Sequence, residues 1–389
     1  MVRFFLVLVA LVVLVALVGP PVLGWSPVGY ALWWATNTTP PEVALRGPEG
    51  VVRGPVDVQV IVPDPDLVDV VQATVNDTPI PPGMVLHLDT QALPDGEQRV
   101  RVVVRDHSLH RNTASAETTL QTDNTPPALR LELQPAAPTE GHTLVLRIYT
   151  DQDADLSGDV DGRPLAIQPG SAFRWAVVGF SPDTPERTVH ISLSASDPVG
   201  NIAKLAQTYD LVRTEYPSEH LDLPADLEPL LDPQVRADED ARLAEIYQKI
   251  SGPARWEGTF LQPAPGEVTT IFGISRTYNA HTYVVRHGGV DFAAYIGDDV
   301  HAANNAVVVF AGKLQVHGNT LILDHGAGVY STYAHLSDIL VQPGDEVKKG
   351  DVVAHVGGTG LSTGPHLHWE LWVAGANVDP LEWTQRDIP

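Results

Sequence analysis

The sequence predicts a mainly β protein, built from two β-sandwich modules, a helical linker and a C-terminal antiparallel β domain. Three observations support this prediction. Short runs of alternating apolar and polar residues, separated by turn residues, occupy most of the chain, as expected for half-buried strands. A pattern that begins near residue 37 recurs about ninety residues later, which indicates repeated modules. Helical periodicity is confined to one segment between them and the last domain.

Composition restricts the possible functions. Lys and Arg number 24 against 48 Asp and Glu, a formal charge of −24 that disfavours a nucleic-acid partner. Cysteine is absent, so disulfides, thiolate metal sites and a cysteine nucleophile are excluded. A metal ion would therefore be held by His, Asp or Glu, and the fifteen histidines are the residues to follow.

The first element, residues 1–35, is predicted to be a signal or transmembrane anchor. Arg3 precedes the apolar run Phe4–Val18, and no charged residue follows until Glu42. From Phe4 to Gly24 the run is about the 20 residues that span a bilayer. We predict an anchor in the cytoplasmic membrane with the remainder outside the cytoplasm; cleavage after an export signal, giving a secreted protein, is the alternative.

Two modules follow, at residues 36–124 and 125–215. Asn37-Thr38-Thr39-Pro40-Pro41 recurs as Asp123-Asn124-Thr125-Pro126-Pro127. A strand-like run that ends at Asp106, with Asn112 beyond it, is echoed by one that ends at Asp197, with Asn201 beyond it. In length and pattern the modules resemble bacterial immunoglobulin-like domains, which implies spacers or binding platforms rather than catalysis.

Residues 216–253 are predicted to form a helical linker. Asp232 can cap a helix that begins at Pro233 and stops before Gly252-Pro253. Leu243, Ile246, Tyr247 and Ile250 fall on one helical face.

The last part, residues 254–389, is predicted to be an antiparallel β domain with strands at 306–310, 320–323, 329–333 and 352–356. Nine of the fifteen histidines lie between His281 and His368. The glycines of His287-Gly288-Gly289-Val290-Asp291 indicate a loop that enters a strand. Strand alternation sends His366 and His368 to one face of another strand, and His335 ends a third.

These motifs, HGGVD, TYAHL and GPHLHWEL, with VKKGDVVAHVGGTGLSTG between the last two, resemble those of the lysostaphin-type (LytM-like) zinc metallopeptidases over about residues 255–383. The resemblance implies that His287, Asp291 and His368 bind one Zn²⁺ and that His335 and His366 are catalytic. Three N/O ligands leave a fourth position for water, as in catalytic zinc sites. Because no H-E-x-x-H motif is present, one of the two remaining histidines is expected to act as base and the other to stabilise the oxyanion; the assignment is open.

By resemblance the substrate is the peptide part of bacterial peptidoglycan, cut at a cross-link or a bridge, with no nucleic-acid partner and with any protein activator unknown. Alternatives are a non-catalytic regulator of other wall hydrolases, a wall-binding adhesin, and a carboxypeptidase or dipeptidase with the same site. His325 and Asp324 are interpreted as structural turn residues.

Overall fold

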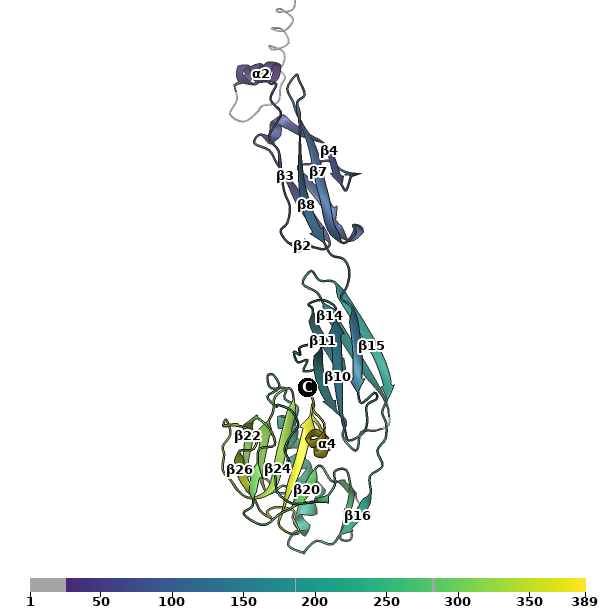
Figure 1. Cartoon of the computed structure of the whole chain (residues 1–389), viewed down its shortest axis with the longest axis vertical. Helices are drawn as coiled ribbons and strands as arrows, with labels where there is room; N and C mark the ends of the chain where they lie inside the picture. The colour runs from purple at the N-terminus through teal and green to yellow at the C-terminus, as the bar shows by residue number, and fades with distance from the viewer. Residues whose placement is uncertain (1–25, 186, 282–283) are drawn as a thin grey trace, which may run out of the picture. The chain divides into compact units, whose positions relative to one another are not determined.

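The computed structural model describes residues 26–389 apart from 186 and 282–283 (Figure 1). It is mainly β, which confirms the predicted fold class. The predicted anchor, Phe4–Gly24, lies outside the described residues. Among the helices that are described, none has the length and apolar character needed to cross a bilayer. The chain divides into two compact units, one holding residues up to Pro126 with Ser196–Asn201, the other Pro127–Ala195 with Ile202–Pro389.

The first unit contains a two-sheet β-sandwich. One sheet has the order β1-β3-β6 and the other β2-β8-β7-β4-β5. Alternate residues of the long strand β7, such as Val100, Val102 and Val104, are fully buried between the sheets. Helix α2 (Pro27–Thr36) adds Tyr30 to the same core. The bounds are β1 Ala44–Arg46, β2 Val51–Val52, β3 Pro55–Ile61, η1 Pro65–Leu67, β4 Val68–Val75, β5 Thr78–Ile80, β6 Val85–Asp89, η2 Thr90–Ala92, β7 Gly96–Asp106 and β8 Thr113–Thr122.

A second pair of sheets begins at residue 129. Their orders are β13-β10-β9 and β12-β11-β14-β15. Leu146, Ile148 and Ile191 lie in the core between them. The bounds are β9 Leu129–Gln134, β10 Thr143–Thr150, β11 Asp155–Val160, β12 Arg163–Pro164, β13 Arg174–Gly179, β14 Thr188–Ser196 and β15 Ile202–Asp210. The immunoglobulin-like likeness and the domain boundaries stay predictions.

The repeat seen in the sequence is also a repeat of hydrogen bonds. Asp106 accepts from the backbone N–H of Asn112 (3.0 Å), whose side-chain amide donates to the Asn37 carbonyl (3.1 Å). Asp197 accepts from the N–H of Asn201 (2.8 Å) in the same way. An Asp that closes a turn after its strand explains why the same residue types recur.

The C-terminal β domain is built on a sheet with the path β17-β20-β27-β24-β23-β22-β25, on which β26 pairs with β24 and β21, and β28 with β27. Leu367, Trp369 and Leu371 of β27 are fully buried in its core. The bounds are β17 Val268–Thr270, β20 Val290–Ala293, β21 Asp299–His301, β22 Ala306–Lys313, β23 Asn319–Asp324, β24 Val329–Ile339, β25 Glu346–Val347, β26 Val352–Val356, β27 His366–Val373, β28 Ala376–Val378 and α4 Pro380–Gln385. Each of the four predicted strands is present, and three extend further than predicted.

Within the second unit, the module that starts at β9 and the C-terminal domain share part of this core. Trp175 packs against Trp256 with ring centroids 5.6 Å apart. The indole N–H of Trp383 donates to Thr143 Oγ1 (2.8 Å).

The segment predicted as a linker packs on the C-terminal domain. Strand β16 (Ser218–Leu221) pairs in parallel with β18 (Ser275–Tyr278), which pairs with β19 (Val285–Arg286). The expected helix is present as η3 (Glu228–Leu231) followed by α3 (Pro233–Tyr247), with Asp232 as its cap. Leu243 and Tyr247 of α3 are buried against Ile322 and Tyr330 of the sheet.

Candidate active site

Two antiparallel strands position the first cluster of polar side chains. In the register of β20 with β27, Asp291 lies opposite His368, and Ala293 lies opposite His366. Alternation along β27 sends Leu367 and Trp369 into the core, so that His366, His368 and Glu370 share the opposite face, as predicted for the two histidines.

The two glycines before Val290 are required by close approach to β27. A Cβ on Gly289 would lie 2.2 Å from the Trp369 carbonyl oxygen, and one on Gly288 would lie 2.7 Å from Glu370 Oε1. Only glycine fits at position 289, since a Cβ does not come this close to a backbone atom, and a Cβ at position 288 would displace the Glu370 carboxylate. The loop can therefore return His287 to the face that carries Asp291.

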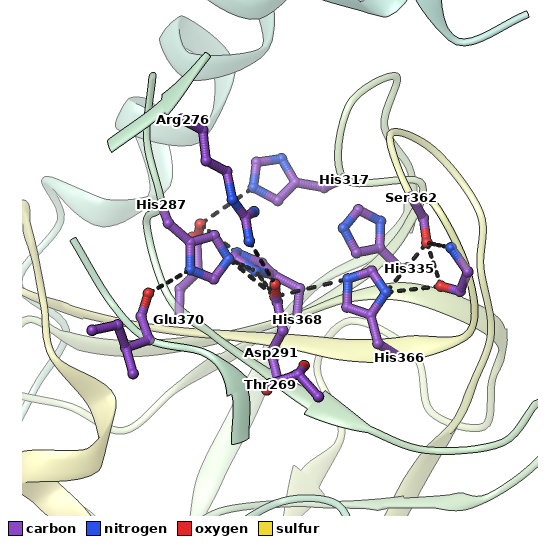
Figure 2. Close-up of polar contacts among 12 residues, drawn as sticks. Thr269, Arg276, His287, Asp291, His317, His335, Ser362, His366, His368 and Glu370 are labelled. Atoms are coloured by element: carbon purple, nitrogen blue, oxygen red, sulfur yellow. Dashed lines mark hydrogen bonds and ion pairs between the residues drawn. The ribbon is translucent and has the colours of Figure 1, made fainter. Parts of the chain in front are cut away.

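Three buried donor atoms meet at this point (Figure 2). His287 Nε2 lies 3.0 Å from Asp291 Oδ1 and 3.1 Å from His368 Nδ1, and the last two atoms are 2.8 Å apart. The other nitrogens fix the tautomers, because His287 Nδ1–H donates to the Ile271 carbonyl (2.9 Å) and His368 Nε2–H donates to Glu370 (3.0 Å). Two nitrogen lone pairs and a carboxylate oxygen thus face one another, an arrangement that fits a divalent cation.

Electrostatics favour an ionised Asp291. Burial alone would raise the pKa of Asp291. When the facing nitrogens of His287 and His368 carry protons, which a bound cation would replace, these rings hydrogen-bond to Asp291 and lower that pKa far below its ordinary value. Arg276 of β18 donates to Asp291 Oδ2 (3.2 Å) and is held in turn by Glu219 of β16. The arginine occupies one carboxylate oxygen and leaves Oδ1 directed at the two imidazoles.

His335 reaches the same space from β24. The sequence placed it at the end of a strand, but β24 continues to Ile339 across a β-bulge at this point. His335 adopts a left-handed conformation with φ of 60°, which costs a non-glycine residue on the order of 1 kcal/mol. Its Nδ1–H donates to the carbonyl of Thr359 (2.8 Å), so the unprotonated Nε2 remains free.

His366 is held in the same manner. Its Nδ1–H donates to the Gly364 carbonyl (2.8 Å), and its Nε2 lies 3.7 Å from Asp291 Oδ1. The ring centroids of His335 and His366 lie 4.8 Å apart. Burial lowers the pKa of His366, and burial together with the neighbouring His366 lowers the pKa of His335 well below its ordinary value. Both imidazoles are therefore neutral at pH 7 and able to accept a proton.

All five residues singled out from the sequence line one cleft of about 380 Å³. Residues of the segment 216–253 also line it, namely Glu219, Leu221, Leu223 and Arg236. The cleft is therefore formed jointly by the C-terminal domain and the chain that precedes it.

Sequence reasoning assigned no role to four polar residues around the cluster. Glu370 could have been found, since it continues the alternation of His366 and His368 along β27. His317 lies between Glu239 Oε1 (2.5 Å) and Glu370 Oε1 (3.4 Å). Burial alone would lower the pKa of His317, but these two carboxylates raise it to about 10. No local pattern points to Glu239, Arg276 or His317, because their partners are distant in the sequence.

His325 agrees with its structural interpretation. It is fully buried, with Nδ1 2.8 Å from the Asn305 carbonyl and Nε2 2.7 Å from Ser331 Oγ. Burial lowers the pKa of His325 to about 4. The ring packs against Phe260 and does not line the cleft.

Comparison with known proteins places this site in a family. Residues 285–380 match Peptidase family M23. The chain is 32% identical over 186 residues to the peptidoglycan DD-endopeptidase ShyB of Vibrio cholerae, covering 46% of this chain and 42% of that protein. It is 39% identical over 114 residues to the DD-carboxypeptidase/endopeptidase Mpg of Neisseria meningitidis, covering 29% of this chain and 26% of that protein. Among solved structures, the catalytic domain of lysostaphin from Staphylococcus simulans is 31% identical, with 31% of this chain and 93% of that chain covered and a TM-score of 0.29.

The match at residues 285–380 and the cluster of His287, Asp291 and His368 indicate that the C-terminal domain is a metallopeptidase domain. Residues 285–380 of this domain are similar to Peptidase family M23, in agreement with the predicted resemblance. The chain spans less than half the length of the curated relatives reported above.

Proposed function

We propose that this protein is an exported, membrane-tethered zinc endopeptidase that hydrolyses peptide cross-links or bridges of bacterial peptidoglycan. The observation that carries the proposal is the meeting of His287, Asp291 and His368 beside two neutral imidazoles in one cleft. Relatives named as peptidoglycan DD-endopeptidases support the substrate class. The uncharged apolar run from Phe4 to Gly24 supports export and anchoring.

The proposed metal ligands are His287 Nε2, Asp291 Oδ1 and His368 Nδ1. Two imidazoles and one carboxylate suit zinc, and three protein ligands leave a position for water or substrate. When bound, zinc supplies a Lewis acid that polarises a carbonyl group and activates water. Arg276 and Glu370 hold the outer atoms of Asp291 and His368, so that the ligand atoms are oriented in advance.

His335 and His366 are proposed to move the protons. The Nδ1–H of each ring donates to a backbone carbonyl, so each Nε2 can accept the proton of the attacking water. Once protonated, the same Nε2–H can donate to the tetrahedral oxygen or to the leaving amine. Either ring can take the first proton, and the other then supports the developing charge.

The alternatives make different predictions. A non-catalytic regulator is expected to lack part of the ligand or histidine set, whereas all five residues are present in this chain. An adhesin would bind wall sacculi whether or not the metal is present. A carboxypeptidase would release single terminal amino acids instead of cutting cross-links.

The test is mass spectrometry of fragments released from purified sacculi by the full chain, with and without a chelator. We expect uncross-linked peptide fragments that disappear when the metal is removed. Binding without release would favour the adhesin, and single amino acids as the products would favour the carboxypeptidase.

A further inference from the structure

Helix α3 carries a buried carboxylate outside the group formed by His287, Asp291 and His368. Glu239 is 6% exposed, although its neighbours Asp238 and Asp240 are exposed. Its Oε2 accepts from the backbone N–H groups of Gln315 (2.6 Å) and Val316 (2.9 Å). A buried carboxylate is retained only when its desolvation is offset by such bonds.

The other oxygen of Glu239 leads toward the site. Oε1 accepts from the backbone N–H (3.1 Å) and from Nδ1 (2.5 Å) of His317. His317 Nε2 lies 3.4 Å from Glu370 Oε1, and the same oxygen accepts from His368 Nε2 (3.0 Å). Figure 2 shows His317 and Glu370 beside His368 in this order.

A second contact links the end of α3 to the same carboxylate. The ring of Tyr247 stacks on Trp372, with centroids 4.2 Å apart and an interplanar angle of 11°. The indole N–H of Trp372 donates to Glu370 Oε2 (2.8 Å). Each oxygen of Glu370 is thus in contact with a side chain, His317 or Trp372, that a residue of α3 contacts in turn.

We propose that helix α3 is a positioning element of the metal site, which orients His368 through Glu370 by way of Glu239–His317 and Tyr247–Trp372. The helix lies outside residues 285–380, so the functional unit begins upstream of the region that matches the family. The inference rests on the proposed role of His368 as a ligand. A carboxylate on the far nitrogen of a ligating histidine fixes the tautomer and the ring orientation, and losing such partners costs 10- to 100-fold in metal affinity or activity.

The test uses the full chain with Glu239→Gln. Both oxygens of Glu239 accept hydrogen bonds from N–H groups, so the NH₂ of glutamine would face a donor in place of an acceptor at one of them. The loop that carries His317 would then lose part of its anchoring. We expect the zinc dissociation constant, measured by competition with a chromogenic chelator, to rise about tenfold. The visible absorption of the cobalt-substituted protein should also change, because it reports ligand geometry. Glu245→Gln, on an exposed position of the same helix, is the matched control and should leave both readouts unchanged.

A second variant guards against a general folding defect. Trp372→Phe retains a ring for Tyr247 to stack on but removes the N–H that binds Glu370. Trp372→Phe should also raise the zinc dissociation constant. The melting temperature of its metal-free form should stay close to that of the parent. Parental zinc affinity and cobalt spectrum in both variants would overturn the proposal. Failure of the parent to bind zinc, or full zinc retention by His368→Ala, would instead overturn the proposed function.

Discussion

Gly289→Ala tests whether the close approach of β20 and β27 is what brings the proposed metal ligands Asp291 and His368 together. The added Cβ would lie 2.2 Å from the Trp369 carbonyl oxygen, whereas Cβ contacts under 3.0 Å are essentially never found. The strands must therefore separate by at least 3.0 − 2.2 = 0.8 Å at this point. Trp369 pairs with Val290 in the register, and the next pair is Asp291 with His368, whose ligand atoms are 2.8 Å apart.

A shift of this size is large for a metal site. Ligand bonds to zinc are about 2.0–2.2 Å long, and a misplacement of about 1 Å can cost on the order of 100-fold in activity. Overpacking of the strand pair should also lower the free energy of unfolding by about 1–3 kcal/mol. We expect weaker zinc binding by chelator competition and a lower melting temperature of the metal-free protein.

Gly312→Ala is the matched control for this substitution. It lies in β22 of the same sheet, and the three atoms nearest to its added Cβ all belong to the movable side chain of Phe310, the first at 3.3 Å. Zinc affinity and melting temperature should stay near those of the parent. If Gly289→Ala has the same zinc affinity and the same melting temperature as Gly312→Ala, the reasoning from close approach is refuted.

Further predictions concern the histidines. His366→Ala should retain about one zinc per chain but lose at least about 100-fold in kcat on cross-linked peptides; near-parental turnover would remove it from the proton-transfer scheme. Treatment with a chelator should abolish hydrolysis, and zinc should restore it; activity that persists in the metal-free protein would exclude a metal-dependent mechanism. The pKa of His325 falls from 6.5 to about 4 on folding, so the unfolded chain binds more protons and stability is lost as the pH drops through that window. Between pH 7.5 and pH 5 this amounts to about 2 kcal/mol, which His325→Gln should remove from the pH dependence measured by urea unfolding in chelator; an unchanged dependence would contradict a neutral, buried His325.

Much of the fold followed from local patterns. Alternation predicted the strands, and for Val352–Val356 it predicted both ends correctly. Strand periodicity also placed His366 and His368 on one face, because a period of two leaves no other arrangement. The extension of β24 beyond His335 was missed, since a bulge with a left-handed residue interrupts the alternation that marks a strand.

The surroundings of the site could not be predicted in the same way. Arg276 meets Glu219 across 57 residues of sequence, and His317 meets Glu239 across 78. Such pairs depend on how separate segments pack, and neither residue type nor spacing signals them in a single sequence. Helix α3 was predicted from its cap and its apolar face. The burial of Glu239 was not predicted, because this residue lies among charged neighbours in the sequence.

The central claim is that His287, Asp291 and His368 hold one catalytic metal ion. A crystal structure of the zinc-loaded full chain, with anomalous data collected at the zinc absorption edge, tests it most directly. We predict one strong peak about 2.0–2.2 Å from His287 Nε2, Asp291 Oδ1 and His368 Nδ1, with water in the remaining position. A peak elsewhere, or a protein atom such as a Glu370 oxygen as fourth ligand, would contradict the account.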